Sequence, residues 1–453
     1  VADPWQPPGH NVILLGNLMD NRYVAPLYAR RYIAADAYYP GHGGHVLRTV
    51  HDPWGSGHNV IFAGGSDVDS VATAVDHLLD ALVVHGKDVH LPALLDVVIG
   101  AALLADHPDL AIDPDEAFIQ SQMDEAHKML ETSAHGGITD PLGRAGIYYH
   151  ATGKVGWAEL FKRLAFLMYE DFQKGRTQYG GAWGMDADFR LHVMIPALDL
   201  AEEAPVFSDD ERLQITRIFA QFIEDAIPHA ADAIAHRRTR HNHWTFAALG
   251  LMLSAQYFGA YYGVAEAEDW MYVADECFIP QCHTARSHEN SNGYQWLTLS
   301  HAMHYALARP YPAFFDEGHV RTICDLAIVS MDNLGYQSSY GDTRTVFGWG
   351  TEFPLLAAAA WYYDDGRYQW ALQRMTYEPT LRIGTRYLGG YRNDITPVEP
   401  VDLLGATYAP LDPTFHNSFE GDKVLPAEAA YDKVVFRAGF DPEDEYLLLD
   451  GLM

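Results

Sequence analysis

The chain has little cysteine, little lysine and no long apolar run, and the first and the last of these shortages each exclude a class of protein. Its 453 residues include three cysteines, which cannot form a disulfide framework. No run of about 18 apolar residues is free of charge, so the sequence predicts no membrane-spanning helix. Only 7 of the 30 basic residues are lysine; the rest are arginine, whose planar guanidinium suits carboxylates and sulfates.

Positive charge is also scarce. The chain carries 61 acidic residues and a formal net charge of -31, which argues against a general nucleic-acid binder because DNA and RNA are polyanions. However, 48% of the residues are hydrophobic and only 20% are charged, enough to bury a large core. The composition therefore predicts a globular protein with neither nucleic acid nor membrane as its partner.

The first part of the chain predicts a small α/β domain over residues 1–87. Two short apolar runs, 11–16 and 59–65, end in glycine, as buried strands do before tight turns. Residues 68–84 then carry apolar side chains at helical spacing after a capping Asp67. We expect two strands of one small sheet, followed by a helix.

Residues 88–380 predict a large all-helical domain. Many amphipathic helices in succession suggest a bundle, a solenoid or a closed (α/α) toroid, and the lack of a visible fixed-period repeat disfavours the solenoid. The expected helices cover residues 91–105, 115–131, 157–172, 189–201, 209–235, 244–262, 294–308 and 319–333.

After residue 380 the pattern changes to short β-type segments at 385–389, 433–437 and 445–450. These predict the opening strands of an antiparallel sheet over residues 381–453, which we expect to continue beyond this sequence, because the last strand would otherwise leave an uncovered edge. The predicted fold class is therefore multidomain α+β: a small α/β domain, a large helical domain and an incomplete antiparallel sheet.

Two polar clusters precede predicted helices. The first, 236–243, holds the densest positive charge of the chain and ends in Asn242 and His243; arginines at a helix N-terminus favour an anion site, although some of them would pair with surface carboxylates. The second, 288–294, contains Glu289 and Asn290 and ends in Tyr294. Asparagine and serine there could simply cap the helix.

Together the clusters supply an amide, an imidazole and a phenol. These groups suit the removal of a carbon-bound proton beside a carboxylate, because hydrogen bonds to the carboxylate stabilise the enolate-like intermediate. A base must take the proton, and an acid must protonate the leaving oxygen. Histidine and tyrosine suit those two tasks.

The sequence resembles the heparinase II/III-like polysaccharide lyases, which are related to toroidal alginate lyases. The resemblance is carried by four features: Asn242-His243, then Glu289-Asn-Ser-Asn-Gly-Tyr294 about fifty residues later, Tyr340-Gly-Asp342, and the run Tyr431-Asp-Lys-Val-Val-Phe436 leading to Tyr446-Leu-Leu-Leu-Asp450. It implies a lyase that cleaves a uronic-acid-containing polysaccharide by β-elimination. It also implies that residues 88–380 form an (α/α) toroid and that residues 381–453 open an antiparallel β-sandwich, which is incomplete in this sequence.

The resemblance also implies roles for single residues. Asn242 would neutralise the uronate carboxylate, His243 would assist it or act as base, and Tyr294 would protonate the glycosidic oxygen and could also be the base. The residues expected to contact substrate are Arg240, Glu289, Asn290, Tyr340, Asp342 and Arg344. No metal ligand and no required cofactor is predicted, with a structural metal left open for the continuation of the sandwich.

Alternatives remain for activity and for partners. A glycoside hydrolase would need two cleft carboxylates, for which Asp186 or Asp188 and Glu289 are candidates; a glycan-binding protein would need none. The expected partner is an anionic polysaccharide, and association with a second copy or with the rest of the sandwich stays open. A polysaccharide substrate fits a secreted or periplasmic location.

Two weaker clusters could hold a metal ion. Cys277, Cys282, His283 and His288 superficially resemble a zinc set, but adjacent Cys282 and His283 leave no finger loop between them. His301 and His304 lie one helical turn apart, a spacing that also occurs on ordinary polar helix faces.

Overall fold

The computed structural model describes residues 5–132, 138–174, 187–236, 242–287, 289–341, 352–375, 390–410 and 431–451. It is a mixed α+β protein with fifteen α-helices in this part of the chain, a small sheet near the N-terminus and an antiparallel sheet near the C-terminus. The chain divides into two compact units. The first comprises Val1–His229, Leu249–Tyr272 and Leu381–Gly389, and the second comprises Ala230–Ala248, Val273–Thr380 and Gly390–Met453.

The first unit contains a four-stranded sheet in the order β1-β3-β2-β6. Its strands are β1 (Val12–Leu15), β3 (Val60–Gly65), β2 (His45–Val50) and β6 (Leu95–Val98). β1 and β3 run parallel, and both other pairings are antiparallel. The two strands expected at 11–16 and 59–65 are thus confirmed as neighbours in one sheet.

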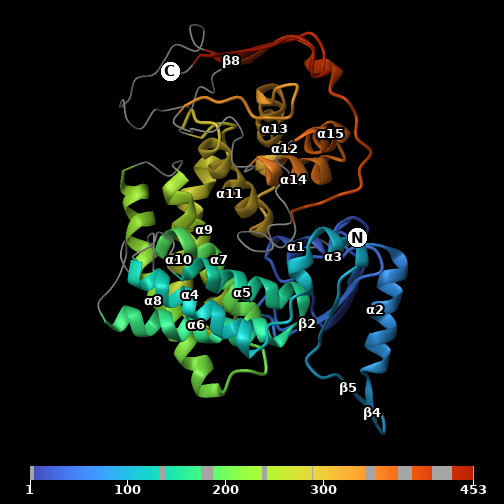
Figure 1. The fold of residues 1–453 in the computed structure, drawn as a ribbon, viewed down its shortest axis with the longest axis vertical. Coiled ribbons are helices and arrows are strands. Elements are labelled where there is room, and N and C mark those ends of the chain that lie inside the picture. The colour runs from blue at the N-terminus through green and yellow to red at the C-terminus, as the bar shows by residue number, and fades with distance from the viewer. Residues whose placement is uncertain are drawn as a thin grey trace. The chain divides into compact units, whose positions relative to one another are not determined.

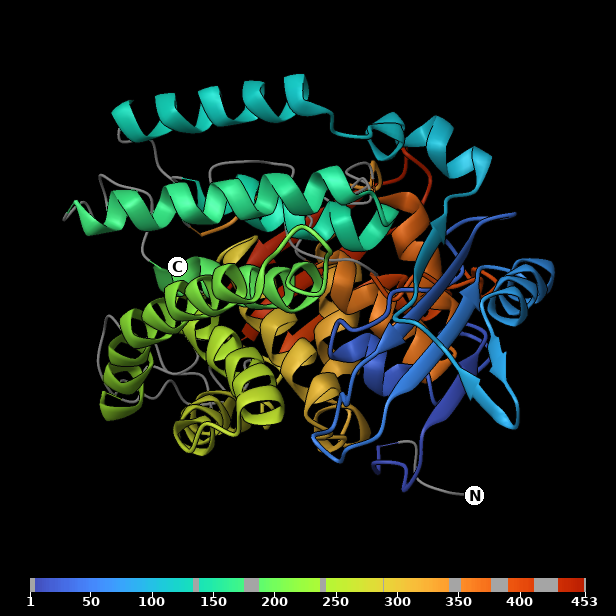
Figure 2. The same cartoon turned by 90° about the horizontal axis from the view of Figure 1, so that it is seen from below.

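Helix α2 (Val68–Asp80) packs against β2 and β3, and Figure 2 shows it beside the strands. Asp67 caps it, accepting a hydrogen bond from the backbone N–H of Ser70. Four buried apolar residues form the core between helix and sheet: Leu47, Ala63, Ala74 and Leu78.

Two expected elements are wrong in this region. The predicted helix over residues 91–105 is instead strand β6, which pairs with β2, followed by the short helix α3 (Ala101–Asp106). The helix predicted to reach residue 84 ends at Asp80, because the following residues form a hairpin of β4 (Val83–His85) and β5 (Asp88–His90). Valine favours the strand here, since its branched side chain packs well on a pleated surface.

The helices of the first unit pack in pairs: α5 against α6, α5 against α7, and α4 against α6 (Figure 1). Their bounds follow the apolar periodicity closely, and α5, at residues that the periodicity did not single out, is buried on nearly every side. They are α4 (Glu116–Thr132), α5 (Thr139–Thr152), α6 (Val155–Gln173), α7 (Ala187–Ala201) and α8 (Asp209–Ala235), the last of which continues into the second unit.

The second unit is built on α11 (Tyr294–Ala308), α13 (His319–Ser330), α14 (Phe353–Tyr363) and α15 (Gly366–Arg374). α14 contacts α11, α13 and α15. An antiparallel sheet of β7 (Gly405–Pro410), β8 (Tyr431–Arg437) and β9 (Tyr446–Asp450) follows, with β8 in the centre. The antiparallel strands expected at 433–437 and 445–450 are confirmed, and the segment at 385–389 lies outside the described residues.

The remaining helices are α1 (Ala25–Ala29), α9 (Asn242–Tyr262), α10 (Glu266–Gln281) and α12 (Ala313–Asp316). Within the part of the chain that the structure describes, no helix is long and apolar enough to cross a membrane. The domain boundaries predicted at residues 87 and 380 stay predictions.

Candidate functional site

Helix α9 begins at Asn242, the first residue of the predicted catalytic set. The Asn242 side chain is buried, with 2% of its surface exposed, and its Oδ1 accepts a hydrogen bond of 2.8 Å from the backbone N–H of His243. His243 is exposed. At the start of the helix, His243 is therefore accessible to solvent, whereas the side chain of Asn242 is buried.

Helix α11 begins at Tyr294, the third residue of that set. Gly293 precedes it with φ 110°, a conformation that residues with a side chain rarely adopt. This turn makes Tyr294 the half-buried first residue of a helix whose other residues, 295–308, are all buried. The phenol is therefore neither sealed in an apolar interior nor fully in solvent.

The first turn of α9 is bonded to α11 within the second unit. Thr245 Oγ1 lies 2.9 Å from Nδ1 of His301 and donates its own proton to the carbonyl oxygen of Asn242 at 2.9 Å. A hydroxyl has one proton to donate, so His301 Nδ1–H must be the donor to Thr245. The rings of Phe246 and His301 also meet edge to face at 4.6 Å.

This contact relates the starts of the two helices that carry the predicted catalytic residues. His301 is seven residues beyond Tyr294, a rise of about 10 Å along the helix axis. Thr245 is three residues, less than one turn, beyond Asn242. The structure thus brings the α9 start against the middle of α11, two turns from the tyrosine.

A buried polar network lies in the same unit, around Lys433 of β8. The Lys433 side chain is 0% exposed and its ammonium donates to Asp432 Oδ1 at 2.7 Å, to Asp450 Oδ1 at 2.9 Å and to Asn290 Oδ1 at 2.9 Å. The Arg286 side chain, which is 2% exposed, forms an ion pair with Asp432, with 2.9 Å between Nε and Oδ2. Two buried cations are thus paired with two carboxylates, as burial of charge requires.

Asn290 is the centre of this network. Its Oδ1 also accepts from Arg286 Nη2 at 2.6 Å, and its amide donates to both oxygens of Asp450, at 3.1 and 2.9 Å. Asn290 therefore fixes the loop before Tyr294 to strand β9. Its predicted contact with substrate stays a prediction, but the structure gives it this second, positioning task.

Tyr340 belongs to the same network. Gln295 donates a hydrogen bond to its hydroxyl and accepts one from Arg286, and the Lys433 ammonium lies 4.3 Å from the centre of its ring. Burial raises the pKa of Tyr340 above its usual value, so the phenol stays protonated at neutral pH. Burial, assisted by the charge of Arg286, lowers the pKa of Lys433, while Asp432 opposes both.

The network joins segments that lie far apart in the sequence and that were singled out separately. They are the loop with Asn290, the turn at Tyr340, and the strands with Asp432, Lys433 and Asp450. Sequence reasoning missed Arg286 and Gln295, because each bonds partners from other segments and neither stands in a recognisable motif.

The other predicted contacts fall in two groups. Glu289 is half-buried beside Asn290. Arg240, Asp342 and Arg344 lie outside the described residues, as do Asp186 and His288.

Among the metal candidates of the sequence, Cys277 and Cys282 are fully buried, and burial raises the pKa of the Cys277 thiol to about 12. His283 is exposed on the surface and its Nε2 lies 2.7 Å from the Tyr311 hydroxyl.

A second group of perturbed acids lies in the first unit, at the end of α7. Burial raises the pKa of Glu202 to about 7, and the neighbouring Glu203 carboxylate adds to the effect. Burial, with the charges of Glu202 and Glu203, also raises the pKa of Asp199 well above its usual value. The Tyr262 hydroxyl lies 3.5 Å from Glu202 Oε2. Carboxyl groups that keep a proton near neutral pH are candidates for acid catalysis.

We compared the sequence with known protein families and with curated proteins. The sequence matches no protein-family model, and a comparison with curated proteins gives no significant match.

The first prediction concerns the Lys433 network. Replacing Lys433 by Met removes the buried cation that pairs with Asp450 and with Oδ1 of Asp432. We therefore expect the free energy of unfolding to fall by about 3 kcal/mol or more. Urea unfolding followed by circular dichroism measures this change. Lys128→Met is the control: Lys128 pairs with Glu125 but is 66% exposed, so its loss should cost less than about 1 kcal/mol. Equal losses in both variants would contradict the stabilising role of the network.

The second prediction concerns Glu202 and pH. Folding raises the pKa of Glu202 from 4.5 to about 7. Between pH 4.5 and pH 7 the Glu202 carboxyl group is therefore protonated in the folded state but ionised in the unfolded state. Stability should therefore fall as pH rises from about 4.5 to 7, by about 3 kcal/mol from this group. Glu202→Gln should be progressively more stable than the parent over that window, whereas the exposed Glu131→Gln should keep a constant difference. A pH-independent difference for Glu202→Gln would refute the raised pKa.

Proposed function

We propose that the protein is a polysaccharide lyase that cleaves a uronic-acid-containing polysaccharide by β-elimination. The observation that carries the proposal is the pair of helix starts in the second unit: Asn242 and His243 begin α9, Tyr294 begins α11, and a Thr245–His301 hydrogen bond of 2.9 Å joins the two helices. The imidazole is exposed and the phenol is half-buried, so that a polymer can reach both.

The reaction divides among three side chains. The uronate carboxylate is neutralised by the Asn242 amide, which can donate two hydrogen bonds through its nitrogen, with His243 assisting it or acting as the base. The base removes the proton on the carbon beside the carboxylate; the electron pair forms a carbon–carbon double bond and the glycosidic C–O bond breaks. Tyr294 protonates the departing oxygen.

The polar network supports this proposal by positioning. Asn290 and Gln295 flank Tyr294 in sequence, and both are held by Arg286. A proton donor placed within fractions of an ångström gains much of its rate advantage from such orientation. We further propose that the helices belong to an (α/α) toroid, that β7–β9 open a β-sandwich, and that the enzyme is secreted or periplasmic, where anionic polysaccharides occur.

Glycoside hydrolysis is the second candidate, and one observation favours it. A hydrolase needs a carboxylic acid that is still protonated near neutral pH and a second carboxyl group. Glu202, with a pKa of about 7, and the neighbouring Asp199 meet the first requirement. Hydrolysis releases reducing ends without creating a double bond, so product absorbance separates the two reactions.

The third prediction tests the lyase. On a panel of uronate polymers, we expect the parent to release product that absorbs in the ultraviolet band of unsaturated uronate. Tyr294→Phe should reduce this rate at least about 100-fold, since it removes the proton donor, while leaving the circular dichroism spectrum and the melting temperature unchanged. Tyr272→Phe is the matched control, because Tyr272 is 61% exposed on α10, and should keep full activity.

Two outcomes would overturn the lyase. One is an undiminished rate of absorbing product in Tyr294→Phe. The other is release of reducing ends without absorbance in the parent, especially if Glu202→Gln abolishes it, which would establish the hydrolase instead.

A further inference from the structure

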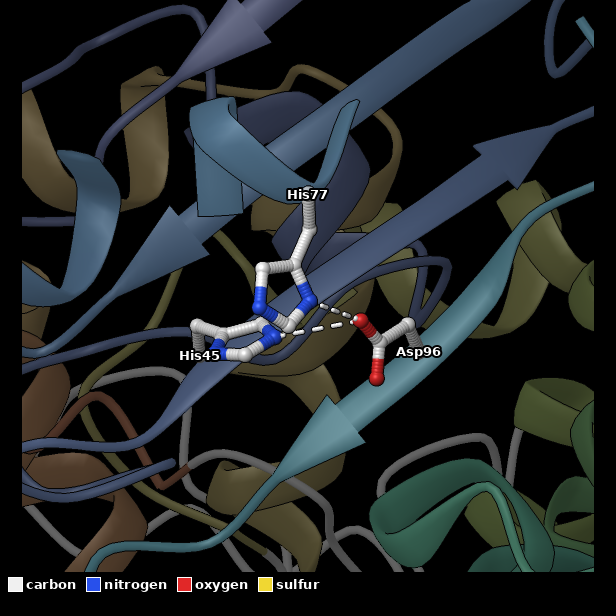
Figure 3. Close-up of side chains that lie close together, drawn as sticks. All are labelled: His45, His77 and Asp96. Atoms are coloured by element: carbon white, nitrogen blue, oxygen red, sulfur yellow. Dashed lines mark hydrogen bonds and ion pairs between the residues drawn. The ribbon is translucent and has the colours of Figure 1, made fainter. Parts of the chain in front are cut away.

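Three potential metal ligands from separate elements converge in the first unit, outside the residues discussed above for catalysis. They are His45 of β2, His77 of α2 and Asp96 of β6. Asp96 Oδ2 lies 2.6 Å from Nδ1 of His77 and 3.3 Å from Nε2 of His45. Figure 3 shows both imidazole rings turned toward this single oxygen.

The cluster is closed on one side and open on the other. The His45 side chain is 3% exposed, whereas those of His77 and Asp96 are 44% and 42% exposed. The two rings meet edge to face at 4.5 Å. Burial acts to raise the pKa of Asp96, but the hydrogen bonds from His77 and His45 outweigh it and hold the pKa below its usual value.

The spacing fits a small divalent ion. The three ligand atoms lie within 4.8 Å of one another. Zinc binds nitrogen and carboxylate oxygen at about 2.0–2.1 Å in a tetrahedron, which puts neighbouring ligands about 3.3 Å apart. The His45–Asp96 separation already has this value. The shorter His77–Asp96 separation must widen, and the exposure of both side chains leaves them room to move.

We propose that His45, His77 and Asp96 form a zinc site with a fourth position open to solvent. Two imidazoles and one carboxylate are a ligand set that zinc uses in proteins, with water completing the tetrahedron. The ion would join two strands of the sheet, β2 and β6, to helix α2. Zinc binding would therefore stabilise the folded unit, because a ligand that binds only the folded state shifts the unfolding equilibrium toward that state.

The second unit contains a comparable group, His283, Glu317 and His319, which serves as an internal comparison. His283 Nδ1 lies 3.7 Å and His319 Nε2 lies 3.4 Å from Glu317 Oε2. His283 and Glu317 are about half exposed, and the other nitrogen of His283 is close to Tyr311. Without a buried member, this group lacks the anchored ligand that His45 supplies.

The test is a zinc titration of the untagged full chain after treatment with a chelator. We expect one equivalent of Zn²⁺ to bind in competition with a chromophoric chelator and to raise the melting temperature. His77→Ala and Asp96→Asn should each weaken zinc binding at least about 100-fold, since even residues that only support a ligand contribute 10- to 100-fold. Asp96→Asn retains the shape of the side chain, which protects the test against misfolding.

Two controls make the result specific. His42→Ala removes a histidine of the same unit that pairs with Asp67 at 2.9 Å and is 84% exposed, and His283→Ala disrupts the group in the second unit. Both should leave the affinity of the first equivalent unchanged. No zinc binding by the folded parent, or an affinity that falls as much in either control as in His77→Ala, would overturn the site. Because the readout is binding and melting, the outcome does not depend on the proposed lyase activity.

Discussion

The second unit depends on the pairing of one buried ammonium ion. Lys433 has no exposed surface, and leaving a buried charge without its partner costs about 3–5 kcal/mol, a large share of the stability of a domain. Its partners come from two directions: Asp432 and Asp450 from the sheet, and Asn290 from the loop before α11. The requirement to satisfy this charge therefore fixes the loop that leads to Tyr294.

Several features of the fold could be predicted from the sequence because they are local. Helices such as α4 and α13 bury one face and show it as periodicity, so their bounds were nearly correct. The run 91–105 was misassigned because a short apolar segment fits a buried strand as well as a helix, and pairing with β2 decided between them. α14, buried along most of its length, has no polar face whose spacing could reveal it.

The residues of the candidate sites also fall into those that the sequence could reveal and those that it could not. Asn242, His243 and Tyr294 were recognisable because each stands at a helix start in a polar cluster. Arg286, His45, His77 and Asp96 were not, because their contacts join elements that are distant in sequence, and no spacing within one segment encodes such a contact. Residue chemistry can be read locally, but its convergence is a property of the packed chain.

The bonds between Asn290 and Asp450 have a consequence for biosynthesis. The two residues are separated by 160 positions, and at about 5–20 residues per second a ribosome needs about 8–30 seconds to pass from one to the other. Throughout that interval the nascent polypeptide carries its tyrosine loop without the strand that anchors it. The proposed lyase would therefore stay inert until the ribosome had passed Asp450.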